Sequence, residues 1–369
     1  MTEKLRDLLH DRAADVDFPT PDLDVLVRAG DQRLRRRRGL VAVGSVAALA
    51  VAAALVLPTL DNAGDSPDAA TATGSDALPT DVVSWANGSV LHAGDAQVDL
   101  GFEVLAFVQT TAGYVAVDPD GVVHSVVDGA ISAIGHTAVP SAHLVTDHDS
   151  TLVGWLSDEG DVPAFVVHDL ALGSGVLEDS SATTAAMGGL ADERDPAYFY
   201  ALDGDTAYWR DERGAVAVDI TNGEVSVIDA EARNGFDLVD VQDGVLAFYG
   251  DQGVEVGGSR ESARPLPGVM ESSGVLSPLA TMYAPDAELA RVEGLDGTPV
   301  PLMVPADYFF STVYEWSDDQ TVRVIALQDE DASADLLTCS ISTGACELLV
   351  DGAGGQGELQ LPVGERLGG

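Results

Sequence analysis

Short runs of apolar residues, separated by turns rich in Asp and Gly, fill the chain from about residue 82 to residue 363. In four places an apolar run leads into an acidic turn, and the turn leads into a second run with alternating apolar positions. Alternating positions bounded by turn residues predict half-buried strands joined in hairpins. Glycine supplies the positive φ that tight hairpin turns need. The glycines of the four turns are Gly121, Gly160, Gly214 and Gly253.

The spacing of these turns indicates a repeated unit. The four glycines are 39, 54 and 39 residues apart, and two looser copies follow near residues 280–286 and 321–329. A unit of several strands every forty residues or so is typical of a β-propeller. The sequence therefore predicts an all-β protein with a six-bladed propeller, and five to seven blades remain possible. A pair of β-sandwiches is the alternative, because alternating strands alone do not distinguish the two folds.

The two ends of this region are predicted to meet. Ser89–His92 near its start and Glu358–Leu361 near its end are both short and apolar enough to form strands. We expect them to pair within one blade, which would close the ring.

Residues 39–57 depart from the strand pattern, because only Ser45 among them is polar. As a helix this segment would be about 28 Å long, close to the ~30 Å hydrocarbon thickness of a bilayer. Clustered arginine stays on the cytoplasmic side of a membrane. We therefore expect one transmembrane helix, a cytoplasmic N-terminus and an extracellular C-terminal domain. A cleaved signal peptide is the alternative, although 38 residues precede the apolar run. The orienting residues are Arg35, Arg36, Arg37 and Arg38.

These patterns divide the chain into five parts. The first is a cytoplasmic tail, which is either solvated or a docking segment for a cytoplasmic partner. The linker after the membrane helix is acidic and rich in Ala, Thr, Ser, Gly and Pro, so we expect it to be flexible. The parts are the tail at 1–38, the helix at 39–57, the linker at 58–81, the propeller at 82–363 and a C-terminal tail at 364–369.

Composition narrows the classes of function. The 369 residues include 61 Asp and Glu against 18 Lys and Arg, a formal net charge of −43. A nucleic-acid partner is excluded, because such binding needs a basic surface to displace counterions. No sequence motif for a nucleophile, a nucleotide, a cofactor or a metal occurs in a suitable context. We therefore expect no catalytic, cofactor or metal residues.

The two cysteines are predicted to form a disulfide. Cys339 and Cys346 flank a turn at Ser342–Gly344, which would place them on opposite strands of a hairpin. The expected extracytoplasmic location permits oxidation. A reduced pair packed as small apolar residues is the alternative.

The four-strand unit with its acidic turn resembles the TolB-like and WD40-like propellers. The Trp-Asp dipeptide of WD40 repeats is absent from the expected strand ends. The whole layout resembles single-pass membrane proteins with extracytoplasmic propellers in high-GC Gram-positive bacteria. This resemblance implies protein interaction more than a particular activity.

Three functions remain open at this point. The first is a membrane-anchored module that binds an extracytoplasmic protein or ligand and is not an enzyme. The second is an anti-sigma-like regulator that couples the ectodomain to a cytoplasmic partner, and the third is an extracellular hydrolase or lyase. For the first, Arg260 and Arg264 in the long stretch 257–277 are candidates for binding an anionic group. The alternative is that these arginines only neutralise the charge of nearby Asp and Glu side chains.

Overall fold

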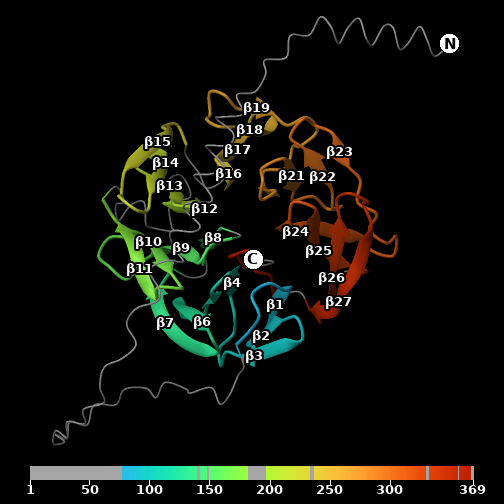
Figure 1. The fold of residues 1–369 in the computed structure, drawn as a ribbon, viewed down its shortest axis with the longest axis horizontal. Helices are drawn as coiled ribbons and strands as arrows, with labels where there is room; N and C mark the ends of the chain where they lie inside the picture. The colour runs from blue at the N-terminus through green and yellow to red at the C-terminus, as the bar shows by residue number, and fades with distance from the viewer. Residues whose placement is uncertain are drawn as a thin grey trace, which may run out of the picture. The chain divides into compact units, whose positions relative to one another are not determined.

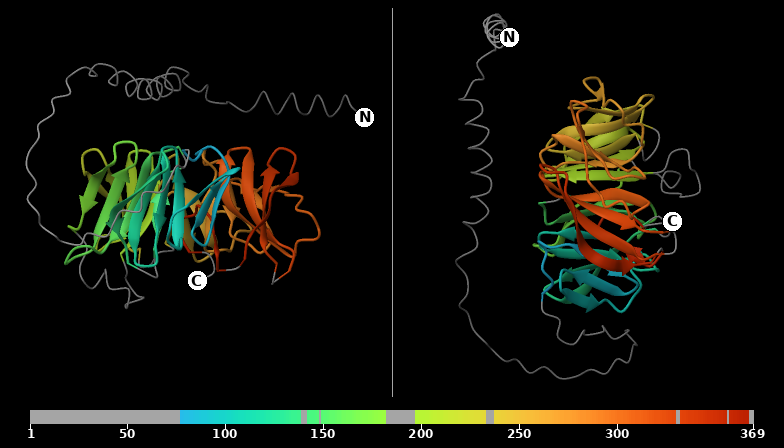
Figure 2. Two further views of the ribbon diagram at one scale, coloured as in Figure 1. Left: turned by 90° about the horizontal axis from the view of Figure 1, so that it is seen from below. Right: turned by 90° about the vertical axis from the view of Figure 1, so that its right-hand side faces the viewer.

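The computed structural model describes residues 77–366, apart from 139–141, 148, 182–196, 233–236, 330–331 and 356. In this part of the chain, 28 strands form seven four-stranded antiparallel sheets. The sheets stand as blades around a common axis (Figure 1), and their strands run across the thickness of the ring (Figure 2). The prediction of an all-β propeller is confirmed. The ring has seven blades, one more than the six that the repeat favoured and within the range of five to seven.

Blades 2 to 7 each use four consecutive strands, with the first strand innermost and the fourth outermost. Blade 2 contains β4 (Ala106–Thr110), β5 (Gly113–Val117), β6 (Val122–Val127) and β7 (Ala130–His136). Blade 3 contains β8 (Leu144–Thr146), β9 (Leu152–Ser157), β10 (Ala164–Asp169) and β11 (Ser174–Asp179). Blade 4 contains β12 (Tyr198–Asp203), β13 (Thr206–Asp211), β14 (Gly214–Asp219) and β15 (Val225–Asp229). Blade 5 contains β16 (Leu238–Gln242), β17 (Val245–Gly250), β18 (Gly253–Gly257) and β19 (Arg264–Pro265). Blade 6 contains β20 (Gly274–Leu276), β21 (Met282–Pro285), β22 (Val292–Gly294) and β23 (Pro299–Val300). Blade 7 contains β24 (Phe310–Asp318), β25 (Thr321–Leu327), β26 (Ala334–Ser340) and β27 (Cys346–Gly354).

Blade 1 joins the two ends of the ring. Its outer three strands are β1 (Ser84–Asn87), β2 (Val90–Ala93) and β3 (Ala96–Asp99), and its innermost strand is β28 (Leu359–Gln360). Ala86 pairs with Gln360, and Asn87 pairs with Leu359. The prediction that both ends of this region build one closing blade is therefore confirmed. The predicted partner strand is wrong, because β28 pairs with β1, whereas residues 90–93 form the next strand, β2. The closing blade also accounts for the blade count, because the two closing segments build a blade in addition to the six repeated units.

Three of the four turn glycines that revealed the repeat are required by the backbone. Gly121, Gly214 and Gly253 have φ values of +87°, +103° and +96°. A Cβ at any of them would lie within 2.3 Å of a backbone carbonyl oxygen at or beyond the end of the same blade's fourth strand. Each turn joins the second and third strands of its blade. The turns are thus glycine-rich because the backbone of the blade's last connection passes so close to them.

The core lies between neighbouring blades. Phe165 of blade 3 stacks on Trp209 of blade 4 with ring centroids 4.6 Å apart, and Phe199 packs edge-on against both rings. Gly154 makes room for this packing, since a Cβ there would lie 2.5 Å from the Phe199 ring. Burial of large aromatic side chains between sheets holds adjacent blades together.

The ring has two distinct faces. We call one the N-terminal face, because residues 77–83 join the ring there: the Gln109 amide donates to the Thr80 carbonyl at 2.8 Å. On this face, turns of successive blades are hydrogen-bonded to each other. The Gly204 N–H donates to Asp147 at 3.0 Å, and the Gly244 N–H donates to Asp203 at 2.8 Å. Acidic residues at these turns therefore have a structural role. We call the opposite face, where the innermost strands begin, the mouth face.

No helix among the described residues is long and apolar enough to cross a membrane. The predicted membrane helix at 39–57, its arginine cluster at 35–38 and the tail at 1–38 lie outside the described residues. They remain predictions.

Candidate binding cavity

A cavity of about 460 Å³ lies at the centre of the ring. Its walls come from the innermost strands β4, β8, β12, β16, β20 and β24, and from the segment Leu361–Arg366 that follows β28. In Figure 1, β4, β8, β12, β16 and β24 are the labelled strands of their blades that lie closest to the axis. The cavity is therefore assembled from residues more than 250 positions apart in the sequence.

Irregular pairing shapes three of these walls. The innermost strands of blades 4 and 5 each contain one shift in register where an extra residue is inserted, and that of blade 7 contains two. Such bulges bend a strand and redirect a side chain. Three of the four extra residues line the cavity, and they are Tyr200, Val239 and Tyr314.

The C-terminal segment turns back and inserts between two innermost strands. The Gly364 N–H donates to the carbonyl of Phe107 on β4, and the Leu144 N–H on β8 donates to the Gly364 carbonyl, both at 2.9 Å. Gly364 has a φ of +77°, and a Cβ there would lie 1.9 Å from the Leu144 oxygen. Only glycine fits this position, so the segment is built to connect blades 2 and 3.

This segment brings a carboxylate to the wall of the cavity. Glu365 Oε1 lies 2.8 Å from His143 Nδ1 and accepts a hydrogen bond from the Tyr198 hydroxyl at 3.0 Å. The other ring nitrogen of His143 lies 2.9 Å from the Phe199 carbonyl oxygen, and the imidazole stacks on Tyr198. Contact with His143 lowers the pKa of Glu365, although burial opposes this effect. Glu365 is therefore held as a carboxylate by residues of blades 3 and 4.

Two aspartates on other walls are also held in place. Asp240 accepts hydrogen bonds from the N–H groups of Leu276 (2.6 Å) and Val241 (2.8 Å), and burial raises its pKa to about 7. Asp286 accepts hydrogen bonds from the hydroxyls of Ser273 at 3.2 Å and Thr312 at 3.1 Å. These contacts link the innermost strands of blades 5, 6 and 7.

The lining is acidic and aromatic. Of the described residues that line the cavity, four carry carboxylates, and the only Lys or Arg is Arg366. Glu315 is paired with Arg323 at 2.8 Å. Tyr314 is 8% exposed, and its hydroxyl has no hydrogen-bond partner among the described residues. The other aromatic side chains of the lining are His143, Tyr198, Tyr200 and Trp316.

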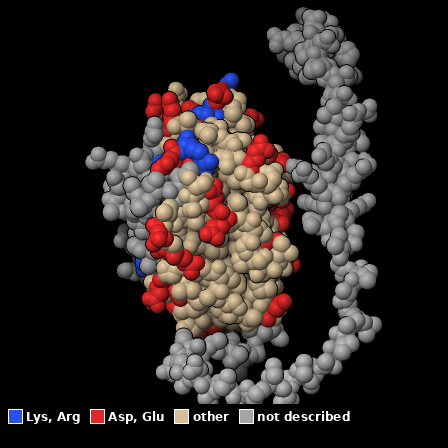
Figure 3. Space-filling model, turned by 90° about the vertical axis from the view of Figure 1, so that its left-hand side faces the viewer, with Lys and Arg blue, Asp and Glu red and all other residues tan. Residues whose placement is uncertain are grey.

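The predicted arginines do not line this cavity. Arg260 lies in the loop between β18 and β19, where it sits 5.0 Å from the centre of the Phe248 ring, 3.7 Å from Asp229 and 3.8 Å from Glu255. Arg264 on the edge strand β19 donates to backbone carbonyls of its own loop. Figure 3 shows a few Lys and Arg side chains near one end of this side of the ring, with Asp and Glu side chains spread over the rest of it. Anion binding by Arg260 and Arg264 stays a prediction.

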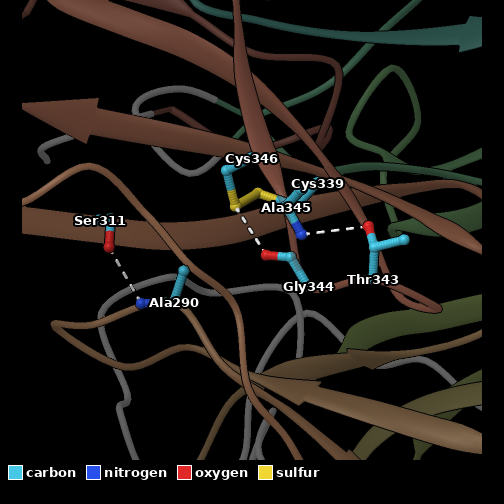
Figure 4. Close-up of a disulfide and its surroundings, with 7 residues drawn as sticks. All are labelled: Ala290, Ser311, Cys339, Thr343, Gly344, Ala345 and Cys346. Carbon is cyan, nitrogen blue, oxygen red and sulfur yellow. Dashed lines mark hydrogen bonds between the residues drawn. A yellow bond between two sulfur atoms is a disulfide. The ribbon is translucent and has the colours of Figure 1, made fainter.

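The predicted disulfide is present. Cys339 on β26 and Cys346 on β27 are directly opposed, with Cα atoms 4.0 Å apart, and their sulfurs are bonded (Figure 4). The turn between them is held by hydrogen bonds, including one from the Ala345 N–H to the Thr343 hydroxyl. The disulfide lies at the outer edge of blade 7 and does not line the cavity.

Within the described ranges, no three His, Cys, Asp or Glu side chains are arranged to hold a metal ion. The sequence did not reveal the cavity residues, because bulges and a returning C-terminal segment leave no periodic signal. The weak signals were Gly364 and Glu365, which stand just after the predicted closing strand.

No protein-family model and no curated protein matches the sequence. Solved structures with a similar fold include AztD from Citrobacter koseri (12% identity, TM-score 0.43, 72% of this chain and 81% of that chain) and TolB from Acinetobacter baumannii (10%, 0.40, 75% and 65%). A prolyl endopeptidase structure matches with 13% identity and a TM-score of 0.50, over 75% of this chain and 47% of that chain. At these identities the likeness shows the propeller fold alone.

Proposed function

We propose that the protein is a membrane-anchored, extracytoplasmic binding module that holds a ligand or a segment of a partner protein in its central cavity and does not transform it. The cavity is the observation that carries this proposal. Its volume of about 460 Å³ falls in the range of roughly 300–1,000 Å³ that is typical of ligand sites. Its polar groups come from blades 2 to 7 and the C-terminal segment, and Glu365, Asp240 and Asp286 among them are held by neighbouring side chains and backbone groups.

The attachment of the chain supports a direction for binding. Residues 77–83 join the ring on the N-terminal face, whereas Glu365, His143 and Tyr198 lie where innermost strands begin, on the mouth face. The segment 77–83 therefore lies on the face opposite this cluster and does not cover the mouth of the cavity.

Site-specific photo-crosslinking in cells that express the full chain tests this proposal. A photoreactive side chain at Ser272, which lines the cavity, should capture a partner or ligand. The matched position is Val227 on the outer strand β15, which is 52% exposed and should capture none. Capture from Val227 alone, or turnover of a captured small molecule by the purified chain, would contradict the proposal.

The topology has its own test. Protease added to intact protoplasts should degrade residues beyond about position 60 and spare the N-terminal tail. Complete protection of the propeller would show that it is not extracytoplasmic.

A further inference from the structure

We infer that the central cavity binds an organic cation through a primary ammonium or guanidinium group. This inference rests on the proposed binding function and names the chemistry of its ligand. Both ammonium and guanidinium groups offer several N–H donors and no acceptor, so they match a site that is rich in oxygen acceptors.

The charges around the cavity favour this class of ligand. Asp240, Asp286, Glu315 and Glu365 line it, and Arg366 is the only Lys or Arg among the described lining residues. Glu315 is paired with Arg323, which leaves three carboxylates against Arg366 and the imidazole of His143. Carboxylates on several walls of one concave site focus a negative potential in it. This negative potential would repel an anionic ligand.

The contacts of Glu365 leave it able to bind a ligand. His143 and Tyr198 both contact Oε1, so within the described part of the chain Oε2 has no partner. The side chain of Glu365 is 55% exposed. It is therefore a fixed carboxylate that still presents one oxygen to the cavity.

The aromatic residues provide an independent argument. Tyr314 is 8% exposed and lines the cavity, yet its hydroxyl has no partner among the described residues. A buried hydroxyl without a partner is unfavourable, and a ligand N–H would give the Tyr314 oxygen a hydrogen bond to accept. Tyrosine and tryptophan faces also attract cations, and Tyr198, Tyr200 and Trp316 lie on the same walls.

The test is calorimetric titration of the full 369-residue chain, in a nonionic maltoside detergent at pH 8, with n-butylammonium. We expect saturable binding of one molecule per chain and no detectable binding of 1-butanol, its uncharged counterpart. The Glu365→Gln variant should weaken binding about tenfold, because a charged partner is lost. The Tyr314→Phe variant should weaken it about threefold, because one hydrogen bond is lost.

A control separates this site from the general negative field of the protein. Asp296 is exposed and lies in the turn between β22 and β23, outside the cavity lining. Asp296→Asn removes the same charge as Glu365→Gln and should leave the affinity unchanged. An equal loss in both variants would overturn the inference, as would binding unaffected by Glu365→Gln and Tyr314→Phe, or no binding of n-butylammonium.

Two sources of the cation can be compared in the same experiment. An N-acetylated and amidated Gly-Lys-Gly peptide presents the same ammonium group on a protein backbone. Tighter binding of the peptide would support a lysine of a partner protein, and tighter binding of n-butylammonium would support a small amine. Failure of both probes, together with capture of a partner from Ser272, would overturn the ligand class and leave the binding function standing.

Discussion

Blade 1 and blades 2 to 7 are built from the same four-stranded sheet, but they depend on the chain in different ways. Blades 2 to 7 consist of consecutive strands joined by short connections, so each can form from local hairpins. Blade 1 needs β28, which pairs with β1 across more than 270 residues of sequence. The segment after β28 then connects to blades 2, 3 and 4 through Gly364 and Glu365. Closure of the ring and completion of the cavity therefore rest on the same eight residues, Leu359–Arg366.

The largest effect should come from removing this segment. A chain that ends at Glu358 loses β28 and the returning segment, and it exposes the edge of β1 and the apolar walls between blades 1, 2 and 7. We expect loss of a single cooperative thermal transition, measured by circular dichroism. A chain that ends at Arg366 is the control and should unfold like the full chain. Equal unfolding of all three chains would show that closure does not depend on this segment.

A single substitution should show the same dependence more mildly. Gly364→Ala places a Cβ 1.9 Å from the Leu144 oxygen at a φ of +77°, and we expect it to lower the free energy of unfolding by about 3 kcal/mol. Gly258→Ala is the matched control, because Gly258 has nothing within 4 Å of the added Cβ. Chemical denaturation of both variants measures the difference. A Gly364→Ala variant as stable as Gly258→Ala would contradict the role of the returning segment.

The disulfide stabilises one hairpin of a continuous blade, so its loss should act locally. Replacing Cys339 and Cys346 with Ser should lower the free energy of unfolding by roughly 2–3 kcal/mol, as expected for a short loop. Binding at the cavity should be unchanged, because the pair lies at the outer edge of blade 7. Loss of n-butylammonium binding in this variant would contradict a local role for the outer hairpin of β26 and β27.

The pH dependence of stability should differ in sign between the two regions. Asp240, in a continuous blade, has a pKa raised to about 7 from 3.8, so it reduces stability as pH rises from about 4 to 7. Glu365, in the closing segment, has a pKa below its ordinary 4.5, so its contribution is present above about pH 4.5 and is lost as pH falls below that. The midpoint temperature of thermal unfolding, measured from pH 3 to 8, should therefore depend less on pH above pH 4 in Asp240→Asn than in the unsubstituted protein. In Glu365→Gln the midpoint temperature should depend less on pH below pH 4.5. Profiles unchanged by the substitutions would contradict the raised pKa of Asp240 and the lowered pKa of Glu365.

The comparison also shows which features a sequence can reveal. Gly121, Gly214 and Gly253 were visible because the same steric demand recurs at each blade. That the two ends share a blade could be predicted because a propeller must close, but the partner of β28 was placed one strand too far along, at 89–92 and not at β1. The cavity could not, since Tyr200 and Tyr314 reach it through bulges, and an extra residue in a strand does not alter the apolar pattern recognisably. Blade 1 was missed when the repeats were counted, because its strands are short and one of them comes from the other end of the chain.

Hydrogen–deuterium exchange of the full chain, with and without saturating n-butylammonium, tests the central claim most directly. We expect slower exchange in β8, β12 and residues 361–366 when the ligand is present, with no change in the outer strands β15 and β27. Protection confined to the outer strands, or the same exchange in both states under conditions where calorimetry shows binding, would contradict a binding site at the centre of the ring.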